Sequence, residues 1–142
     1  MRKALLALAA VGLMACDGLT EPLLNFAHNR DKWERVHLTS YTFEFQRSCF
    51  CIPTERARIT VSNEQVSSVI LLSTGQPPDS SSAAFYDVTI DDLFDELGSA
   101  LAHASQVTVT YDQALGYPRT IAIDYIANAV DDEISYEAQL VP

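Results

Sequence analysis

Residues 40–46 read SYTFEFQ and alternate apolar and polar side chains. Successive side chains of an extended strand point to opposite faces, so the three aromatic residues share one face and Thr42, Glu44 and Gln46 share the other. Such a strand is half buried. It predicts a sheet that packs against a core on one face and meets water on the other.

Further strands are predicted on both sides of this stretch. Residues 56–61 and 65–72 form a hairpin around the polar turn 62–64, and three more alternating segments cover residues 106–111, 119–126 and 133–141. The segment between residues 73 and 82 is rich in Ser and Pro, which predicts a mobile surface loop.

Two helices are predicted from apolar residues at helical spacing. The first is most regular over residues 29–37, with Asn29 as its N-cap, although helical spacing starts at Leu23. Thr89 opens the second, and Asp91 and Asp92 in its first turn suit the positive end of the helix dipole. Its apolar stripe consists of Ile90, Leu93, Phe94, Leu97 and Leu101.

The order of these elements is helix, three strands, helix, three strands. We therefore predict an α+β fold of two α-β-β-β units, in which a six-stranded antiparallel sheet carries both helices on one face. The open face presents Thr, Glu, Gln and Arg side chains, a composition that suits either solvation or docking of a partner.

The N-terminus has the features of an export signal. Arg2 and Lys3 precede an apolar run over residues 4–15, which is shorter than the roughly 20 residues of a membrane-spanning helix. Leu13-Met14-Ala15-Cys16 resembles the lipobox of bacterial lipoproteins, in which the cysteine carries lipid after cleavage. We predict a signal peptide over residues 1–15, lipidated Cys16 with a tether over 16–28, and one domain over 29–142. An ordinary signal cut elsewhere is the alternative.

The charge of the chain limits its partners. The sequence has nine basic and nineteen acidic residues, a net charge of −10. Loss of Arg2 and Lys3 with the signal leaves seven basic residues and a net charge of −12. Such a surface repels nucleic acid and anionic lipid head groups, so we predict no nucleic-acid role and a membrane contact through lipid alone.

Several motifs occur together in the order of a known family. The helix with Trp33, the strand that ends at Cys49-Phe50-Cys51, and the later Gly116-Tyr117-Pro118 are followed by acidic residues 131–133. In this combination the chain resembles the DUF6174 family of small bacterial exported proteins, often lipoproteins, over about residues 29–140. The resemblance implies the fold and an envelope location, and it implies no activity, because the family has no established function.

Cys49 and Cys51 are the main chemical candidates. Residues two apart in a strand have Cβ atoms about 7 Å apart, whereas a disulfide needs about 3.8 Å, so a bond requires the chain to turn. Ile52-Pro53 makes a turn credible. A bond in so small a ring is strained and easier to reduce, which suggests a thiol-redox role. A structural disulfide and a pair of buried thiols are the alternatives.

Metal sites have weaker signals. The acidic residues near the last three strands could bind calcium, although they lack the Asp-x-Asp-x-Asp-Gly spacing of a dedicated loop; they are Asp112, Asp124, Asp131, Asp132 and Glu133. A zinc site needs ligands besides the two cysteines, and His28, His37 and His103 lack ligand spacing. We predict no metal and no cofactor.

No hydrolase motif and no glycine-rich phosphate loop occurs in the sequence. We therefore expect a non-catalytic binding or accessory protein, anchored by lipid in the bacterial envelope and facing the periplasm or the cell exterior. It would contact another envelope protein through its open sheet face or the 73–82 loop. A thiol-redox protein that uses Cys49 and Cys51 is the alternative.

Overall fold

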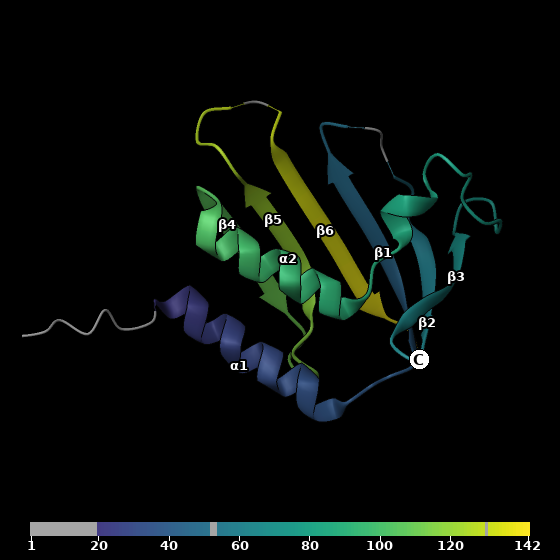
Figure 1. Cartoon of the computed structure of the whole chain (residues 1–142), viewed down its shortest axis with the longest axis horizontal. Coiled ribbons are helices and arrows are strands. Elements are labelled where there is room, and N and C mark those ends of the chain that lie inside the picture. Colours follow the sequence, from purple (N-terminus) through teal and green to yellow (C-terminus); the bar gives the residue numbers. More distant parts are fainter. Residues whose placement is uncertain (1–19, 52–53, 130) are drawn as a thin grey trace, which may run out of the picture.

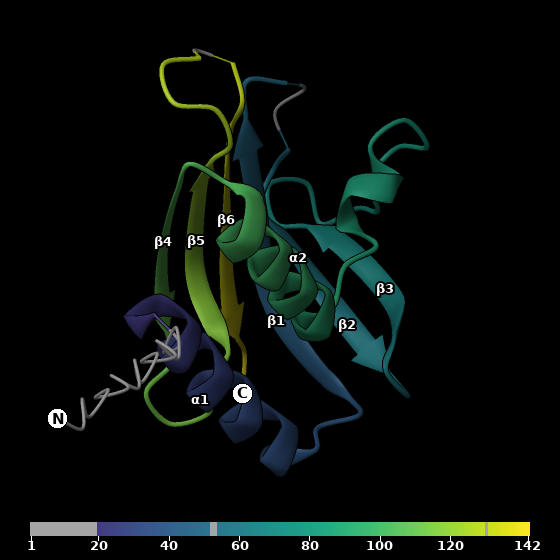
Figure 2. The ribbon, with the colours of Figure 1, turned by 60° about the vertical axis from the view of Figure 1, so that its left-hand side comes forward.

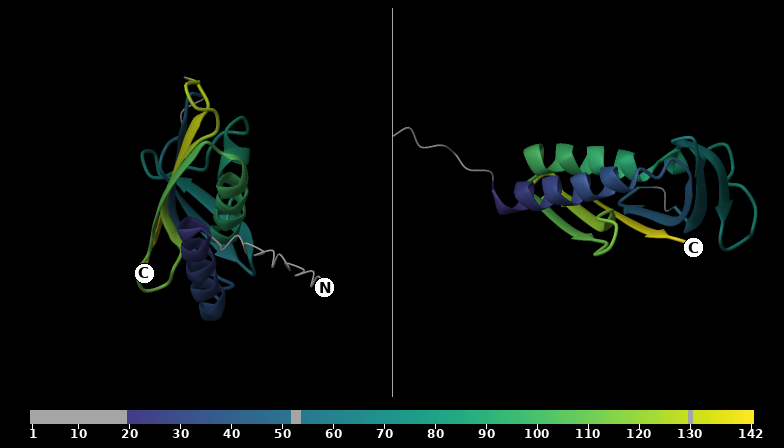
Figure 3. Two further views of the ribbon diagram at one scale, coloured as in Figure 1. Left: turned by 90° about the vertical axis from the view of Figure 1, so that its left-hand side faces the viewer. Right: turned by 90° about the horizontal axis from the view of Figure 1, so that it is seen from below.

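The computed structural model describes residues 20–51, 54–129 and 131–142. Two helices lie side by side on one face of a six-stranded antiparallel sheet (Figures 1 and 3). The elements are α1 (Glu21–Val36), β1 (Tyr41–Cys49), β2 (Ala57–Ser62), β3 (Gln65–Leu71), the short 3-10 helix η1 (Ala83–Tyr86), α2 (Ile90–His103), β4 (Gln106–Tyr111), β5 (Pro118–Asp124) and β6 (Glu133–Leu140). The predicted α+β fold is confirmed.

The strand order is β3-β2-β1-β6-β5-β4, so each α-β-β-β unit supplies one half of the sheet. The halves meet where β1 pairs with β6, from Phe43 opposite Leu140 to Cys49 opposite Ile134. The last strand of the first unit, β3, and the first strand of the second unit, β4, form the two opposite edges of the sheet (Figure 2).

The alternating pattern of β1 works as predicted. Phe43 and Phe45 face the helices and are at most 1% exposed. On α2 the predicted apolar stripe is buried except for Leu101, which packs at the margin of the core. Thr89 caps this helix, accepting from the backbone N–H of Asp92, whose carboxylate accepts from the backbone of Thr89 in return. The cap and the stripe together account for both the start and the orientation of α2.

Helix α1 is longer than the sequence predicts. It begins at Glu21, so residues 21–28 of the expected tether are helical, and Thr20 rather than Asn29 is the N-cap. Pro22 suits the first turn because a proline there loses no intrahelical hydrogen bond. Asn29 lies inside the helix, where its side chain donates to the backbone carbonyl of Asn25.

Two glycines let α1 approach its neighbours. The ring of Phe26 packs against Gly98 of α2, so closely that a Cβ added to Gly98 would lie 3.2 Å from a ring carbon. Gly116, in the β4–β5 connection, has a φ of +83°, and a Cβ there would lie 2.5 Å from the backbone oxygen of Asn29. Gly116 therefore has a geometric role, because only glycine adopts this backbone conformation without strain and leaves room for α1.

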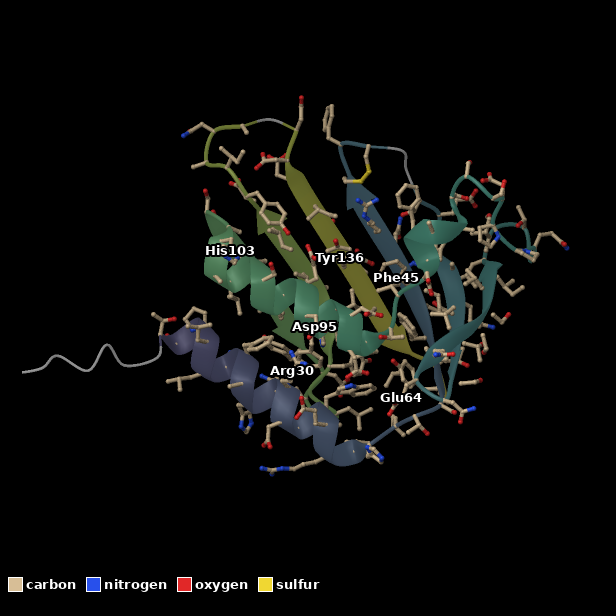
Figure 4. The ribbon with its side chains drawn as sticks, in the orientation of Figure 1. Arg30, Phe45, Glu64, Asp95, His103 and Tyr136 are labelled. Carbon is tan, nitrogen blue, oxygen red and sulfur yellow. A yellow bond between two sulfur atoms is a disulfide. The ribbon has the colours of Figure 1, made fainter. Side chains whose placement is uncertain are left out.

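Polar contacts complete the joint between the helices. Arg30 of α1 and Asp95 of α2 face each other and form an ion pair at 2.9 Å (Figure 4). The indole nitrogen of Trp33 donates to Asp91 at 3.2 Å, and the Trp33 ring meets that of Tyr117 edge to face. Burial raises the pKa of Asp91, although the bond from Trp33 opposes this.

We predict that Gly116→Ala destabilises the protein by roughly 3 kcal/mol, because strain at positive φ adds to overlap with α1. Gly75→Ala is the matched control: Gly75 has a φ of +69° but nothing within 4 Å of an added Cβ, so only the strain of about 1 kcal/mol remains. Urea unfolding of both variants measures the difference. Equal losses would contradict the close approach of α1.

Candidate functional site

The sheet face opposite the helices carries most of the polar side chains of the central strands. Alternation places Thr42, Glu44, Gln46 and Ser48 of β1 on this side, and Glu137 and Gln139 of β6 lie beside them in register. Among the described residues, neither helix covers this face (Figure 3). The predicted open, polar sheet face is therefore present.

Ion pairs cross the first half of this face. Arg58 of β2 donates to Glu44 of β1 at 2.9 Å, and Arg56 donates to Glu137 of β6. On the second half, the hydroxyl groups of Thr110 and Thr120 lie 2.6 Å apart. Each of these arginine and glutamate side chains thus has a partner of opposite charge. Both ion pairs are in contact with solvent, so they contribute little to stability.

The two predicted redox cysteines lie together at the end of β1. Cys49 and Cys51 form a disulfide with Cα atoms 5.1 Å apart, visible as the yellow bond in Figure 4. The chain turns here, as the spacing argument required, and Phe50 between them is 77% exposed. A guanidinium nitrogen of Arg47 lies 3.6 Å from the Cys51 sulfur. The sequence left a disulfide and a pair of buried thiols as alternatives, and the structure contains the disulfide. Ile52 and Pro53 lie outside the described residues.

The five candidate calcium ligands are spread over both ends of the sheet. Asp112 lies in the β4–β5 connection, where its carboxylate accepts from the backbone of Ala114 and Leu115. Asp124 ends β5 and lies opposite Glu133, the first residue of β6. Seven residues of β5 separate these ends by roughly 20 Å. In the part of the chain that is described, no group of three or more His, Cys, Asp or Glu side chains could hold a metal ion.

Asp131 and Asp132 lie in the connection between β5 and β6. Asp132 accepts from the backbone N–H of Ile126 with one carboxylate oxygen, and its other oxygen is buried without a hydrogen-bond partner. The turn is therefore held by a side chain that the sequence suggested as a metal ligand. The histidines are likewise apart: His28 is exposed on α1, His37 ends that helix, and His103 closes α2.

The 73–82 segment is a surface loop, as predicted, and its turn is held by hydrogen bonds. The Asp79 carboxylate accepts from Ser81 and Ser82, and these bonds, led by the Ser81 hydroxyl, lower the pKa of Asp79. The sequence did not predict η1 directly after the loop, where the Tyr86 hydroxyl donates to the backbone of Glu55. A single short turn has no apolar periodicity to detect.

Three tyrosines have strongly raised pKa values. Burial raises the pKa of Tyr41, Tyr111 and Tyr125 to about 12, and for Tyr125 a hydrogen bond donated to Glu96 adds to this effect. The Tyr111 hydroxyl is buried without a hydrogen-bond partner. These groups are neutral at physiological pH, so none of them can serve as a general base there.

A family model described as a family of unknown function, DUF6174, matches residues 25–142. The chain belongs to this family. The match confirms the resemblance seen in the sequence, and its range includes most of α1. Neither the curated proteins nor the solved structures contain a match to this chain.

The predicted signal peptide and the predicted lipidation site Cys16 lie outside the described residues. Within the described ranges, no helix is long and apolar enough to cross a membrane.

We predict that Asp112→Ala destabilises the protein by about 1 kcal/mol, because two backbone donors lose their acceptor. Asp131→Ala, a change of equal charge at an exposed position, should leave stability within about 0.5 kcal/mol. Thermal melting with and without millimolar calcium measures both effects, and we expect no calcium dependence. A calcium-induced rise in the wild-type midpoint that disappears in the Asp131 variant would restore the calcium hypothesis.

Proposed function

We propose that this protein is a non-catalytic binding module of the bacterial envelope, held at the membrane by lipid on Cys16, and that it contacts another envelope protein through its open sheet face. The observation that carries the proposal is the exposed, largely polar face of the sheet, which lies opposite the face that packs in the core. A rigid sheet presents such side chains at fixed spacing, which favours recognition.

The anchor places this face near the membrane. Few residues separate Cys16 from Glu21, the first residue of α1, so the domain lies within a few nanometres of the lipid. A net charge of −12 keeps its body away from anionic head groups. Lipid supplies the attachment and the sheet face supplies the specificity, which limits the partners to other envelope components.

The test compares two variants with the same charge change. Thr120→Arg with Gln139→Arg adds bulk and charge to exposed open-face positions, whereas Ala27→Arg with His28→Arg does so on the exposed surface of α1. Each mature, lipidated protein is crosslinked in membranes. We expect the open-face variant to lose its crosslinked partner at least tenfold and the helix variant to keep it. Loss of the partner in neither variant would exclude the open face as the interface.

A thiol-redox protein is the second candidate. It is favoured by the disulfide at an accessible end of β1, with Cys51 exposed and the guanidinium of Arg47 close to its sulfur. A nearby positive charge stabilises a thiolate and makes the reduced form more reactive.

Redox titration of the mature protein against glutathione separates the two candidates. A binding module with a structural disulfide should have a reduction potential below about −300 mV, and Cys49→Ser with Cys51→Ser should lower stability without removing the captured partner. A potential near −200 mV, together with loss of function in a variant that stays folded, would favour the redox protein. Leu24→Ala, at an exposed position of α1, leaves both cysteines in place and is the control.

A further inference from the structure

The open sheet face contains a hollow at its disulfide end. The hollow has a volume of about 500 Å³ and is lined by residues of β1, β4, β5 and β6. Its floor is a row of short side chains in register across these four strands: Ser48 opposite Ser135, Ser135 opposite Ala122, and Ala122 opposite Thr108. The row on one side carries the longer Gln106, Asp124 and Glu133 side chains, so the short side chains leave a depression beside them.

Two carboxylates border the hollow. Asp124 lies directly between Gln106 and Glu133 in the row next to the floor. Like charges directly opposite each other on neighbouring strands repel and destabilise the sheet. One carboxylate oxygen of Asp124 is buried and has no hydrogen-bond partner.

Other carboxylates on the open face have basic partners, whereas Asp124 and Glu133 have none among the described residues. Glu44 and Glu137 each pair with an arginine. Among the described residues, no lysine or arginine forms an ion pair with Asp124 or Glu133. The hollow therefore has two carboxylates at its border and no cation of its own, on a protein whose net charge is strongly negative.

The shape and the apolar groups favour an organic cation over a metal ion. A hard cation such as calcium takes six or more oxygen ligands, and the described residues contain no group that could supply a metal site. In contrast, the hollow has the Ala122 methyl on its floor and the exposed ring of Phe50 at its wall. An alkyl stem can pack on the methyl group, and the charged end of the stem can meet the carboxylates and the aromatic ring.

We propose that this hollow receives a lysine or arginine side chain of the envelope partner. The proposal rests on the proposed function and specifies the chemistry that the open face recognises. The basic side chain would place a positive charge beside Asp124 and Glu133 and relieve the repulsion between these two carboxylates. The partner would thus bind with a basic, protruding segment in this acidic hollow of the sheet.

The first test is an NMR titration of the mature domain with a short peptide that contains one lysine. We expect saturable shifts of the backbone amides of Ala122, Asp124, Glu133 and Ser135. A peptide with norleucine at the same position has the alkyl stem without the charge and should cause no such shifts. Shifts spread evenly over all exposed carboxylates, or no shifts with the lysine peptide, would overturn the proposal. The same local shifts with calcium alone at lower concentration would overturn it in favour of a metal site.

Matched variants locate the binding. Asp124→Asn with Glu133→Gln should weaken peptide binding about tenfold, and Ala122→Leu, which fills the floor at an exposed position, should weaken it similarly. Glu44→Gln with Glu137→Gln removes the same charge from the same face and should change affinity less than twofold. Equal weakening by the two double variants would mean that long-range charge, rather than the hollow, attracts the peptide.

Crosslinking of the lipidated protein separates this proposal from the proposed function. In one outcome, the variant Asp124→Asn with Glu133→Gln keeps the partner, and the variant Thr120→Arg with Gln139→Arg loses it. The open face is then the interface, and the proposal that the hollow binds a basic side chain is wrong. If both variants lose the partner and the Glu44 and Glu137 control keeps it, both proposals are supported. If both variants keep the partner, both proposals fail.

Discussion

The antiparallel pairing of β1 with β6 holds the two halves of this protein in one sheet. Seven pairs of residues lie opposite each other along this seam, and residues from opposite ends of the domain form it. The seam also sets the two faces, because the side-chain period of a strand is two. With Phe45 opposite Ala138 towards the helices, Gln46 and Glu137 must lie on the open face. A shift of one residue would exchange the core and the surface.

The helices complete the core through close contacts at small residues. Gly98 makes room for the Phe26 ring, and Gly116 lets the β4–β5 connection reach the backbone of α1. Trp33 lies at the meeting point of these parts, in edge contact with both Tyr41 and Tyr117. The joint uses shape more than charge, since the ion pairs of α1 are exposed and contribute little. One face of the sheet is therefore buried in this core, and the other face is exposed to solvent.

The same register places the chemistry of the open face. The rows across β4, β5 and β6 bring Gln106, Asp124 and Glu133 side by side and align short side chains next to them. The disulfide at the end of β1 closes the neighbouring turn and lies against the same hollow. The proposed binding site and the disulfide are therefore adjacent, so variants that change only one of them are needed to test each proposal.

The helices and strands could be predicted from the sequence, because periodicity and helix capping depend only on residues that are close together in the chain. The alternation of residues 40–46, the Thr89 cap and the α2 stripe were sufficient for the α+β fold, and the motifs around Cys49, Cys51 and Gly116 for the family. The packing of α1 on α2 could not be predicted in this way, because it depends on the contact of Phe26 with Gly98, which lies 72 residues later in the chain. The tertiary structure also separated Asp112 from Asp124 and brought Asp124 beside Glu133. Which residues become neighbours in this way depends on the register between strands. The register cannot be seen in the residue pattern of a single strand, because it relates strands that are separate in the chain.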